Sequence, residues 1–156
     1  MKINNIWPKA ALLFAIAVTL SISYKNIKHP GNLIWSDMEG YYTYLPSVFI
    51  YGDFVKEAVK DTNYIRPYKD TQKIYSKYTC GVAMLEMPFF LISHVVAGLK
   101  GENQDGKSPI YGRGLAFAGL FYLWVGMFFL YKLGIRYYEK KWVILSILSI
   151  LLGTNL

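Results

Sequence analysis

The chain has 156 residues, of which 54% are hydrophobic and 17% aromatic, and its formal net charge is +7. The apolar residues are concentrated in four blocks, which favours an integral membrane protein over a soluble domain. Lys and Arg residues flank these blocks and form no continuous basic stripe, so membrane topology explains the positive charge better than nucleic-acid binding does. The single cysteine, Cys80, excludes an intrachain disulfide and a thiolate metal site.

The first apolar block, residues 7–24, is predicted to be an uncleaved membrane helix. Lys2 and Lys9 precede its apolar run, as in a signal peptide, but residues 25–28 follow it with no small-residue cleavage pattern. The block approaches the roughly 20 residues that a spanning helix needs. The basic N-terminal flank predicts a cytoplasmic N-terminus.

An amphipathic surface helix is predicted over residues 37–50. Ser36 is followed by Glu39 at the spacing of a capping box, which indicates a helix start. Pro46 removes one backbone donor, so the helix should kink or break near Leu45. Apolar side chains recur at helical spacing, at Met38, Tyr41, Tyr42, Leu45, Val48 and Phe49. Such a helix should lie along the bilayer surface with its tyrosines at headgroup level, and residues 52–80 should form a polar loop.

The second apolar block, residues 81–99, is predicted to lie in the interface or to re-enter the membrane without crossing it. Glu86 interrupts the block, and a charge in mid-bilayer costs about 3 kcal/mol. The connection after the third block is rich in Lys and Arg and should be cytoplasmic, like the N-terminus. The N-terminus and this connection are both cytoplasmic only if the second block does not cross the membrane. Residues 25–113 then form a long external loop.

Residues 114–133 and 142–156 are predicted to be further membrane spans. The last block is still apolar at its final residue, so we expect a truncated span and a longer protein. The expected fold is an all-α integral membrane protein with about three transmembrane helices and amphipathic juxtamembrane helices. Residues 1–156 would form the N-terminal part of a multi-span domain.

Two carboxylates and several cations are the candidate chemical groups. Asp37 is either a general base at the membrane face or a charge favoured by a helix N-terminus. Glu39 is either a second catalytic carboxylate or the far side of the capping box. Residues two apart on a helix point to different sides, so a divalent metal shared by Asp37 and Glu39 is disfavoured and no cofactor is expected.

Lys77 is the main candidate for binding a phosphate, since it directly precedes the second apolar block. It could equally be an ordinary snorkelling lysine. Arg66 is a weaker phosphate candidate, and the substrate candidates include Tyr41 and Tyr42 at headgroup depth. Further along the chain, Glu86 and His94 could form a proton relay or merely a polar stripe.

Three short motifs carry a family resemblance. They are Trp-Ser-Asp at residues 35–37, Gly-Tyr-Tyr-Thr-Tyr-Leu-Pro at residues 40–46 and Gly-Thr-Asn-Leu at residues 153–156. With the order of elements, they resemble the N-terminal part of GT-C class glycosyltransferases, which include the protein mannosyltransferases and the lipid A aminoarabinose transferases. The resemblance implies an enzyme of the bacterial inner membrane that transfers a sugar from a polyprenyl-phosphate donor to a lipid, glycan or protein acceptor at the periplasmic face.

The resemblance also implies roles for two residues. Asp37 aligns with the catalytic carboxylate early in the first external loop, and Lys77 aligns with the loop lysine that contacts phosphate. Many members have an Asp-Glu pair and a Lys-Pro pair, where this chain has Asp-Met-Glu at residues 37–39 and Lys-Tyr at residues 77–78. This class has many more spans than are present here, so residues 1–156 alone would be inactive.

Two other functions remain open from the residues alone. A transporter or channel subunit would use Glu86 and His94 along a pathway, which requires the second block to span. A non-catalytic membrane anchor or assembly protein would use Asp37 and Glu39 only to cap a helix.

Overall fold

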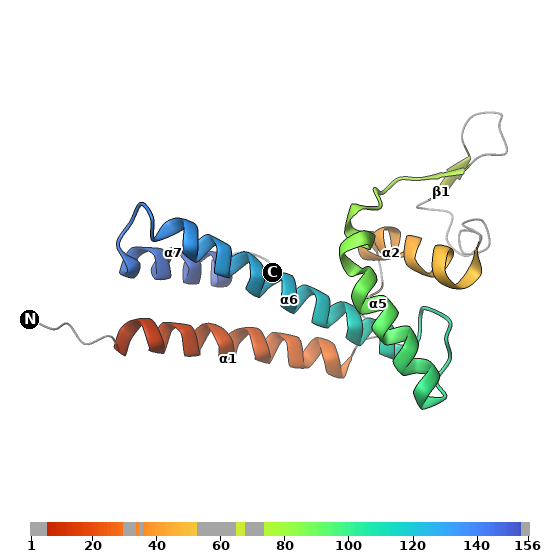
Figure 1. Ribbon diagram of the computed structural model, residues 1–156, viewed down its shortest axis with the longest axis horizontal. Coiled ribbons are helices and arrows are strands. Elements are labelled where there is room, and N and C mark those ends of the chain that lie inside the picture. The colour runs from red at the N-terminus through yellow and green to blue at the C-terminus, as the bar shows by residue number, and fades with distance from the viewer. Residues whose placement is uncertain (1–5, 30–33, 35, 53–64, 68–73, 154–156) are drawn as a thin grey trace, which may run out of the picture. The chain divides into compact units, whose positions relative to one another are not determined.

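The computed structural model describes residues 6–29, 34, 36–52, 65–67 and 74–153, which are mostly helical (Figure 1). The chain divides into two compact units. The terminal unit comprises residues 1–25 and 119–156, and the central unit comprises residues 26–118. Helix α6 (Pro109–Gly134) gives its first turns to the central unit and the rest to the terminal unit.

The terminal unit contains most of α1 (Ile6–Lys28), the second part of α6, and α7 (Lys140–Gly153). A tight turn joins α6 to α7, where the backbone N–H groups of Tyr137 and Tyr138 donate to the Gly134 carbonyl at 3.0 and 2.9 Å. A Cβ at Gly134 would lie 2.7 Å from Val143 Cγ1, so the glycine permits this close return.

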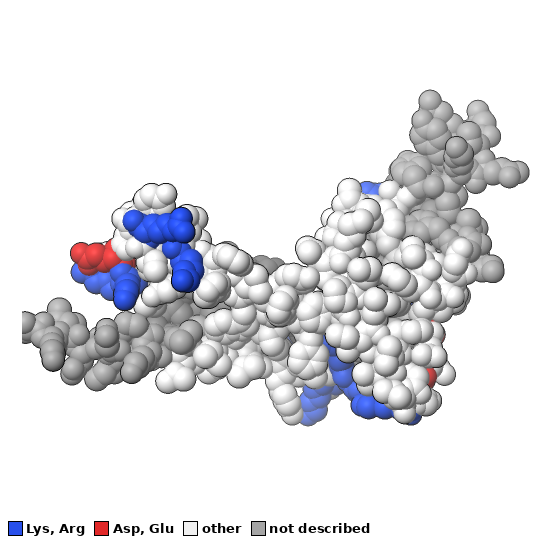
Figure 2. Space-filling model, in the orientation of Figure 1, with Lys and Arg blue, Asp and Glu red and all other residues white. Residues whose placement is uncertain are grey.

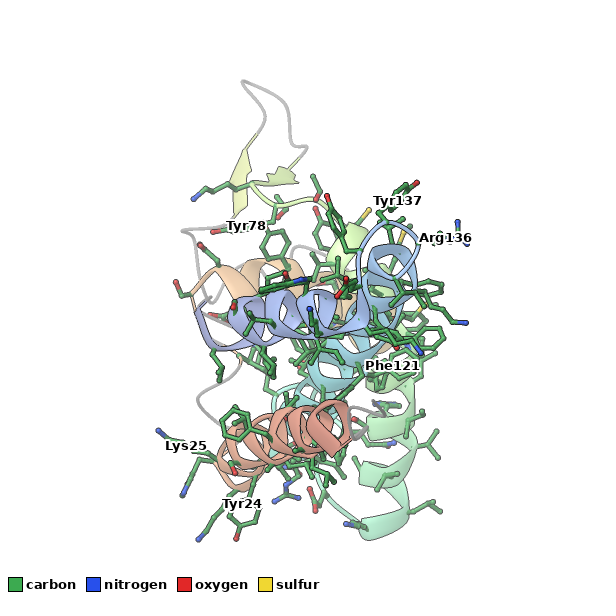
Figure 3. The ribbon with its side chains drawn as sticks, turned by 90° about the vertical axis from the view of Figure 1, so that its left-hand side faces the viewer. Tyr24, Lys25, Tyr78, Phe121, Arg136 and Tyr137 are labelled. Carbon is green, nitrogen blue, oxygen red and sulfur yellow. The ribbon has the colours of Figure 1, made fainter. Side chains whose placement is uncertain are left out.

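Charged side chains gather at the turn between α6 and α7, as Figure 2 shows. The cations near it in the chain are Lys132, Arg136, Lys140 and Lys141, and the Lys141 ammonium lies 3.0 Å from the Glu139 carboxylate. Figure 3 shows Arg136 and Tyr137 projecting from this turn, and Tyr24 and Lys25 projecting from α1. These cations are the ones from which the sequence predicts a cytoplasmic connection.

The helix predicted over residues 37–50 is present in the central unit but is divided into three segments, which are named the surface helices. Helix α2 (Asp37–Tyr42) is followed by α3 (Tyr44–Pro46) and the π-helical turn η2 (Ser47–Tyr51). Pro46 lacks the N–H that would donate to the Tyr42 carbonyl, so the regular hydrogen bonding changes at this point. The expected break near Leu45 is therefore confirmed.

Helix α5 (Gly81–Lys100) packs one face against the surface helices and the start of α6. Its buried side chains follow helical spacing, at Ala83, Glu86, Phe90, Ser93 and Ala97. The centroid of the Phe90 ring lies 5.9 Å from the Tyr42 ring centroid and 5.3 Å from the Tyr111 ring centroid. A Cβ at Gly114 would lie 2.1 Å from Ser93 Oγ, so this glycine allows α5 and α6 to approach closely within the central unit.

The loop of residues 101–108 returns from α5 to the surface helices. The Tyr42 hydroxyl donates to the Gly106 carbonyl at 2.5 Å, and the Tyr51 hydroxyl donates to the Asp105 carbonyl at 2.9 Å. Gly106 has φ +75°, and a Cβ there would lie 2.8 Å from Pro46 Cβ. Only glycine fits both the left-handed backbone and the close approach to Pro46.

Asp105 organises this loop with its side chain. Its Oδ1 accepts hydrogen bonds from the Lys107 and Ser108 backbone N–H groups at 2.8 Å, and from the Ser108 hydroxyl at 2.7 Å. Burial acts to raise the pKa of Asp105, but these hydrogen bonds outweigh burial and bring the pKa below its usual value of 3.8.

Part of the polar loop predicted over residues 52–80 lies outside the described residues, and its described part contains two short strands that were not predicted. Two short strands, β1 (Ile65–Pro67) and β2 (Ile74–Ser76), pair antiparallel with Arg66 opposite Tyr75. Pro67 stands at the end of β1, where a missing N–H is tolerated.

Two described helices, α5 and α6, are long and apolar enough to cross a membrane. Only 11% of the apolar window of α6 is buried inside the protein, so most of its apolar side chains face outward. Large exposed apolar side chains include Phe117, Phe121, Phe128, Phe129 and Leu133. Outward-facing apolar helices of this length are typical of membrane proteins.

Candidate functional site

The start of α2 does not use the predicted capping box. The Ser36 side chain makes no capping hydrogen bond, and its backbone has φ 54° and ψ −136°. The Ser36 carbonyl instead accepts from the Glu39 N–H at 3.1 Å. The capping-box prediction is wrong because this backbone, unusual for a residue with a Cβ, does not present the Ser36 hydroxyl to the first turn.

Asp37 is exposed at the first position of α2 and is held by a residue far along the chain. The Tyr78 hydroxyl donates a hydrogen bond to Asp37 Oδ1, across 41 residues of sequence. Tyr78 lies between β2 and α5, and Figure 3 shows its ring beside α2. The bond therefore joins the start of the surface helix to the segment that leads into α5.

The Tyr78 ring is packed against the same face of α2. A Cβ at Gly40 would lie 2.2 Å from Tyr78 Cδ2, so only a glycine leaves room for the ring. The Tyr41 and Tyr78 ring centroids are 4.6 Å apart, with the rings tilted. The Tyr44 hydroxyl donates to the Tyr78 carbonyl at 2.5 Å. Tyr78 is thus fixed at its ring, its hydroxyl and its main chain.

Lys77 is exposed beside this cluster. Its ammonium nitrogen lies 5.2 Å from the centroid of the Tyr78 ring, which is within cation–π range. The structure thus brings two predicted site residues into contact with one tyrosine, since Asp37 accepts from the Tyr78 hydroxyl and the Lys77 ammonium lies over the Tyr78 ring. The site can combine a proton acceptor with a cation able to bind a phosphate.

The other predicted site residues fall in different places. Arg66 lies in β1, opposite Tyr75. Glu39 is half-buried, and its carbonyl accepts from the Thr43 hydroxyl at 2.6 Å. Among the described residues, no three His, Cys, Asp or Glu side chains gather in a way that could hold a metal ion.

Tyr42 belongs to the hydrophobic core rather than to the exposed cluster. Its side chain is 1% exposed, and its hydroxyl is bonded to the Gly106 carbonyl. Adjacent tyrosines on a helix point in different directions, so Tyr41 meets Tyr78 while Tyr42 points into the core.

The two polar residues predicted within α5 have different surroundings. His94 Nδ1 lies 2.8 Å from the Tyr111 hydroxyl. Glu86 is buried, and within the described part of the chain its Oε2 has no hydrogen-bond partner. A buried carboxyl oxygen of this kind is costly and often functional.

Sequence reasoning missed Tyr78 and Gly40, which complete the cluster around Asp37. Gly40 did carry a signal, because an isolated glycine within a helical pattern often marks a close approach of another segment. The approaching residue is Tyr78, which lies 41 residues after Asp37, and local spacing gives no information about so distant a partner.

Comparisons with known proteins add no relative: the chain matches no family model, no curated protein and no solved structure.

Proposed function

We propose that this protein is a membrane glycosyltransferase that moves a sugar from a polyprenyl-phosphate donor to an acceptor at the periplasmic face of the membrane. The observation that carries the proposal is the cluster of Asp37, Tyr78 and Lys77. It combines the exposed Asp37 carboxylate with the Lys77 cation. Lys77 lies four residues before the apolar helix that begins at Gly81. Transfer from a lipid-linked phosphate sugar would use a proton acceptor and a cation close to a bilayer.

In the proposed reaction, Asp37 accepts the proton of an acceptor hydroxyl or amine. The acceptor atom forms a bond to the anomeric carbon as the bond from that carbon to the phosphate oxygen breaks. The electron pair of the broken bond leaves with the polyprenyl phosphate, and Lys77 stabilises its negative charge.

The charge distribution supports the periplasmic side. The cations of the turn between α6 and α7 favour a cytoplasmic position for that turn. If α6 crosses the membrane, its start at Pro109 lies on the opposite side. Tyr42 and Tyr51 bond the surface helices to residues 105 and 106, just before that start.

The test of this proposal is the Asp37→Asn variant of the protein expressed from its complete reading frame. We expect transfer of a radiolabelled sugar, from a panel of polyprenyl-phosphate hexoses and pentoses, to fall by about 100-fold or more, because a general base alone contributes 10²–10⁴-fold. The Glu139→Gln variant, at the turn between α6 and α7, is the matched control and should retain activity. Full transfer by Asp37→Asn would exclude Asp37 as the base.

One observation favours a second candidate function, a transporter or channel subunit. Glu86 is buried in α5 with an oxygen that has no partner among the described residues, as expected for a carboxyl along an ion or substrate pathway. This function requires α5 to cross the membrane. Labelling of a Cys80→Ser, Lys107→Cys variant with a membrane-impermeant thiol reagent distinguishes the two functions. Labelling from the periplasm supports the glycosyltransferase topology, and labelling from the cytoplasm supports the transporter.

A further inference from the structure

We propose that Tyr78 is a positioning residue that fixes the Asp37 carboxylate for proton transfer; this inference rests on the proposed function. Nothing in the local sequence pattern assigns Tyr78 a role. Its hydroxyl donates to Asp37 Oδ1, so one carboxylate oxygen is held by the protein and the second can serve the acceptor.

The hydroxyl is itself fixed by α2. Asp37, Gly40 and Tyr41 stand at positions i, i+3 and i+4, which lie on one face of a helix. The Tyr78 ring lies across that face, against the bare backbone of Gly40 and 4.6 Å from the Tyr41 ring centroid. The helix that carries the carboxylate therefore also determines where the tyrosine ring sits.

The main chain of Tyr78 is held as well. Its N–H donates to Ser76 Oγ at 3.1 Å, and its carbonyl accepts from the Tyr44 hydroxyl at 2.5 Å. With the backbone and the ring both fixed, a side chain with only two rotatable bonds has little freedom left to move its hydroxyl.

The same bond joins Asp37 to the residue that directly follows Lys77. Lys77 precedes Tyr78 directly, and its ammonium lies 5.2 Å from the Tyr78 ring centroid. Proton acceptance and phosphate stabilisation must occur on opposite sides of the same anomeric carbon, so the distance between these two groups matters. A misplacement of about 1 Å can cost about 100-fold in rate.

The Tyr78→Phe variant tests the role because it removes the hydroxyl and keeps the ring against Gly40 and Tyr41. In the full-length protein, with the polyprenyl-phosphate sugar that supports transfer, we expect kcat to fall about 10- to 100-fold while KM for the donor stays within about twofold. Tyr51→Phe is the matched control, since it also removes a hydroxyl that bonds a distant segment, and it should keep wild-type kcat.

A second variant reaches the same bond without altering Tyr78. In Gly40→Ala the new Cβ would meet the Tyr78 ring at 2.2 Å and displace it, so kcat should fall by a similar factor. A thermal-unfolding cycle of Asp37→Ala and Tyr78→Phe supplies a readout independent of activity. Because the two side chains share one bond, the double variant should lose no more Tm than the larger single change.

The outcomes separate this inference from the proposed function. Wild-type kcat in Tyr78→Phe, together with loss of transfer in Asp37→Asn, overturns the positioning role and leaves the glycosyltransferase proposal intact. A raised donor KM with unchanged kcat assigns Tyr78 to donor binding and also overturns it. A loss of kcat in Tyr51→Phe equal to that in Tyr78→Phe overturns the positioning role as well. Additive Tm losses contradict the shared bond, and full activity in Asp37→Asn overturns both proposals.

Discussion

The central unit adds long-range tyrosine hydrogen bonds to the local Ser and Thr bonds that both units contain. In the central unit, tyrosine hydroxyls bond backbone carbonyls far along the chain. These pairs are Tyr42 with Gly106, 64 residues apart, Tyr51 with Asp105, 54 apart, and Tyr44 with Tyr78, 34 apart. In the terminal unit, the hydroxyls of Thr19, Ser146 and Ser149 each donate to a carbonyl four residues earlier in the same helix.

This difference indicates how each unit obtains its specificity. A buried hydroxyl that bonds one distant carbonyl selects a single tertiary arrangement, because the alternative leaves polar groups unsatisfied. A hydroxyl that bonds its own helix places no condition on neighbouring segments. The central unit therefore specifies its own packing, while the terminal unit presents mainly apolar helix surfaces to its surroundings.

The largest effect that would separate the two units is expected from Gly106→Ala. Its φ of +75° is unfavourable for alanine, and the Cβ would meet Pro46 Cβ at 2.8 Å. Strain and overpacking together should lower the free energy of unfolding by about 2–4 kcal/mol. Thermal unfolding in detergent, with hydrogen exchange over residues 37–51, measures the loss.

Gly119→Ala in the terminal unit is the control for this change. A Cβ there meets nothing within 4 Å, and Gly119 lies inside α6. The variant should be neutral or more stable by up to about 1 kcal/mol, because alanine has the higher helix propensity. Equal destabilisation by the two alanines would break the comparison between the units.

A smaller effect is expected from Tyr42→Phe, which removes the hydroxyl that donates to the Gly106 carbonyl. Leaving this carbonyl without its donor at a buried site should cost about 1–3 kcal/mol of unfolding free energy. Tyr131→Phe, on a half-buried position of α6, should change stability by no more than about 0.5 kcal/mol. Similar shifts in Tm for both variants would contradict the stabilising role of the bond from Tyr42 to Gly106.

The smallest effect concerns acid. The pKa of Asp105 in the folded protein lies below its usual value. The ionised carboxylate therefore stabilises the folded state at any pH above the pKa of the unfolded chain. This stabilisation is lost as the pH falls through the pKa of the folded state. The Tm of the central unit should therefore decline below about pH 4, near the ordinary pKa of aspartate. Asp105→Asn should flatten this part of the profile, and an unchanged slope in that variant would exclude Asp105 as the cause.

Much of the fold follows from local sequence. The apolar block of residues 81–99 predicts α5 (Gly81–Lys100) closely, because its length and composition are those of a buried or membrane helix. Pro46 predicts the division of the surface helix, because the missing N–H is a local property. The hairpin of β1 and β2 is not predictable in this way, since its pairing depends on two three-residue segments of no clear alternation.

The candidate site is predictable only in part. Asp37 and Lys77 stand out through their chemistry and their places beside apolar segments. Tyr78 does not, because its importance lies in a bond to a residue 41 positions earlier. The capping box was wrongly predicted at Ser36, because Ser and Glu three residues apart match its sequence pattern. The backbone of Ser36 at φ 54° prevents it from forming.

The bond from Tyr42 to Gly106 has a consequence for biosynthesis. The acceptor carbonyl is made 64 residues after the donor, and synthesis at 5–20 residues per second delays it by about 3–13 s. During this interval the surface helix emerges without its anchor, and it can settle into its final position only once the loop before α6 exists. Slowing or stalling translation between these two points would therefore prolong a state in which the core tyrosine is exposed.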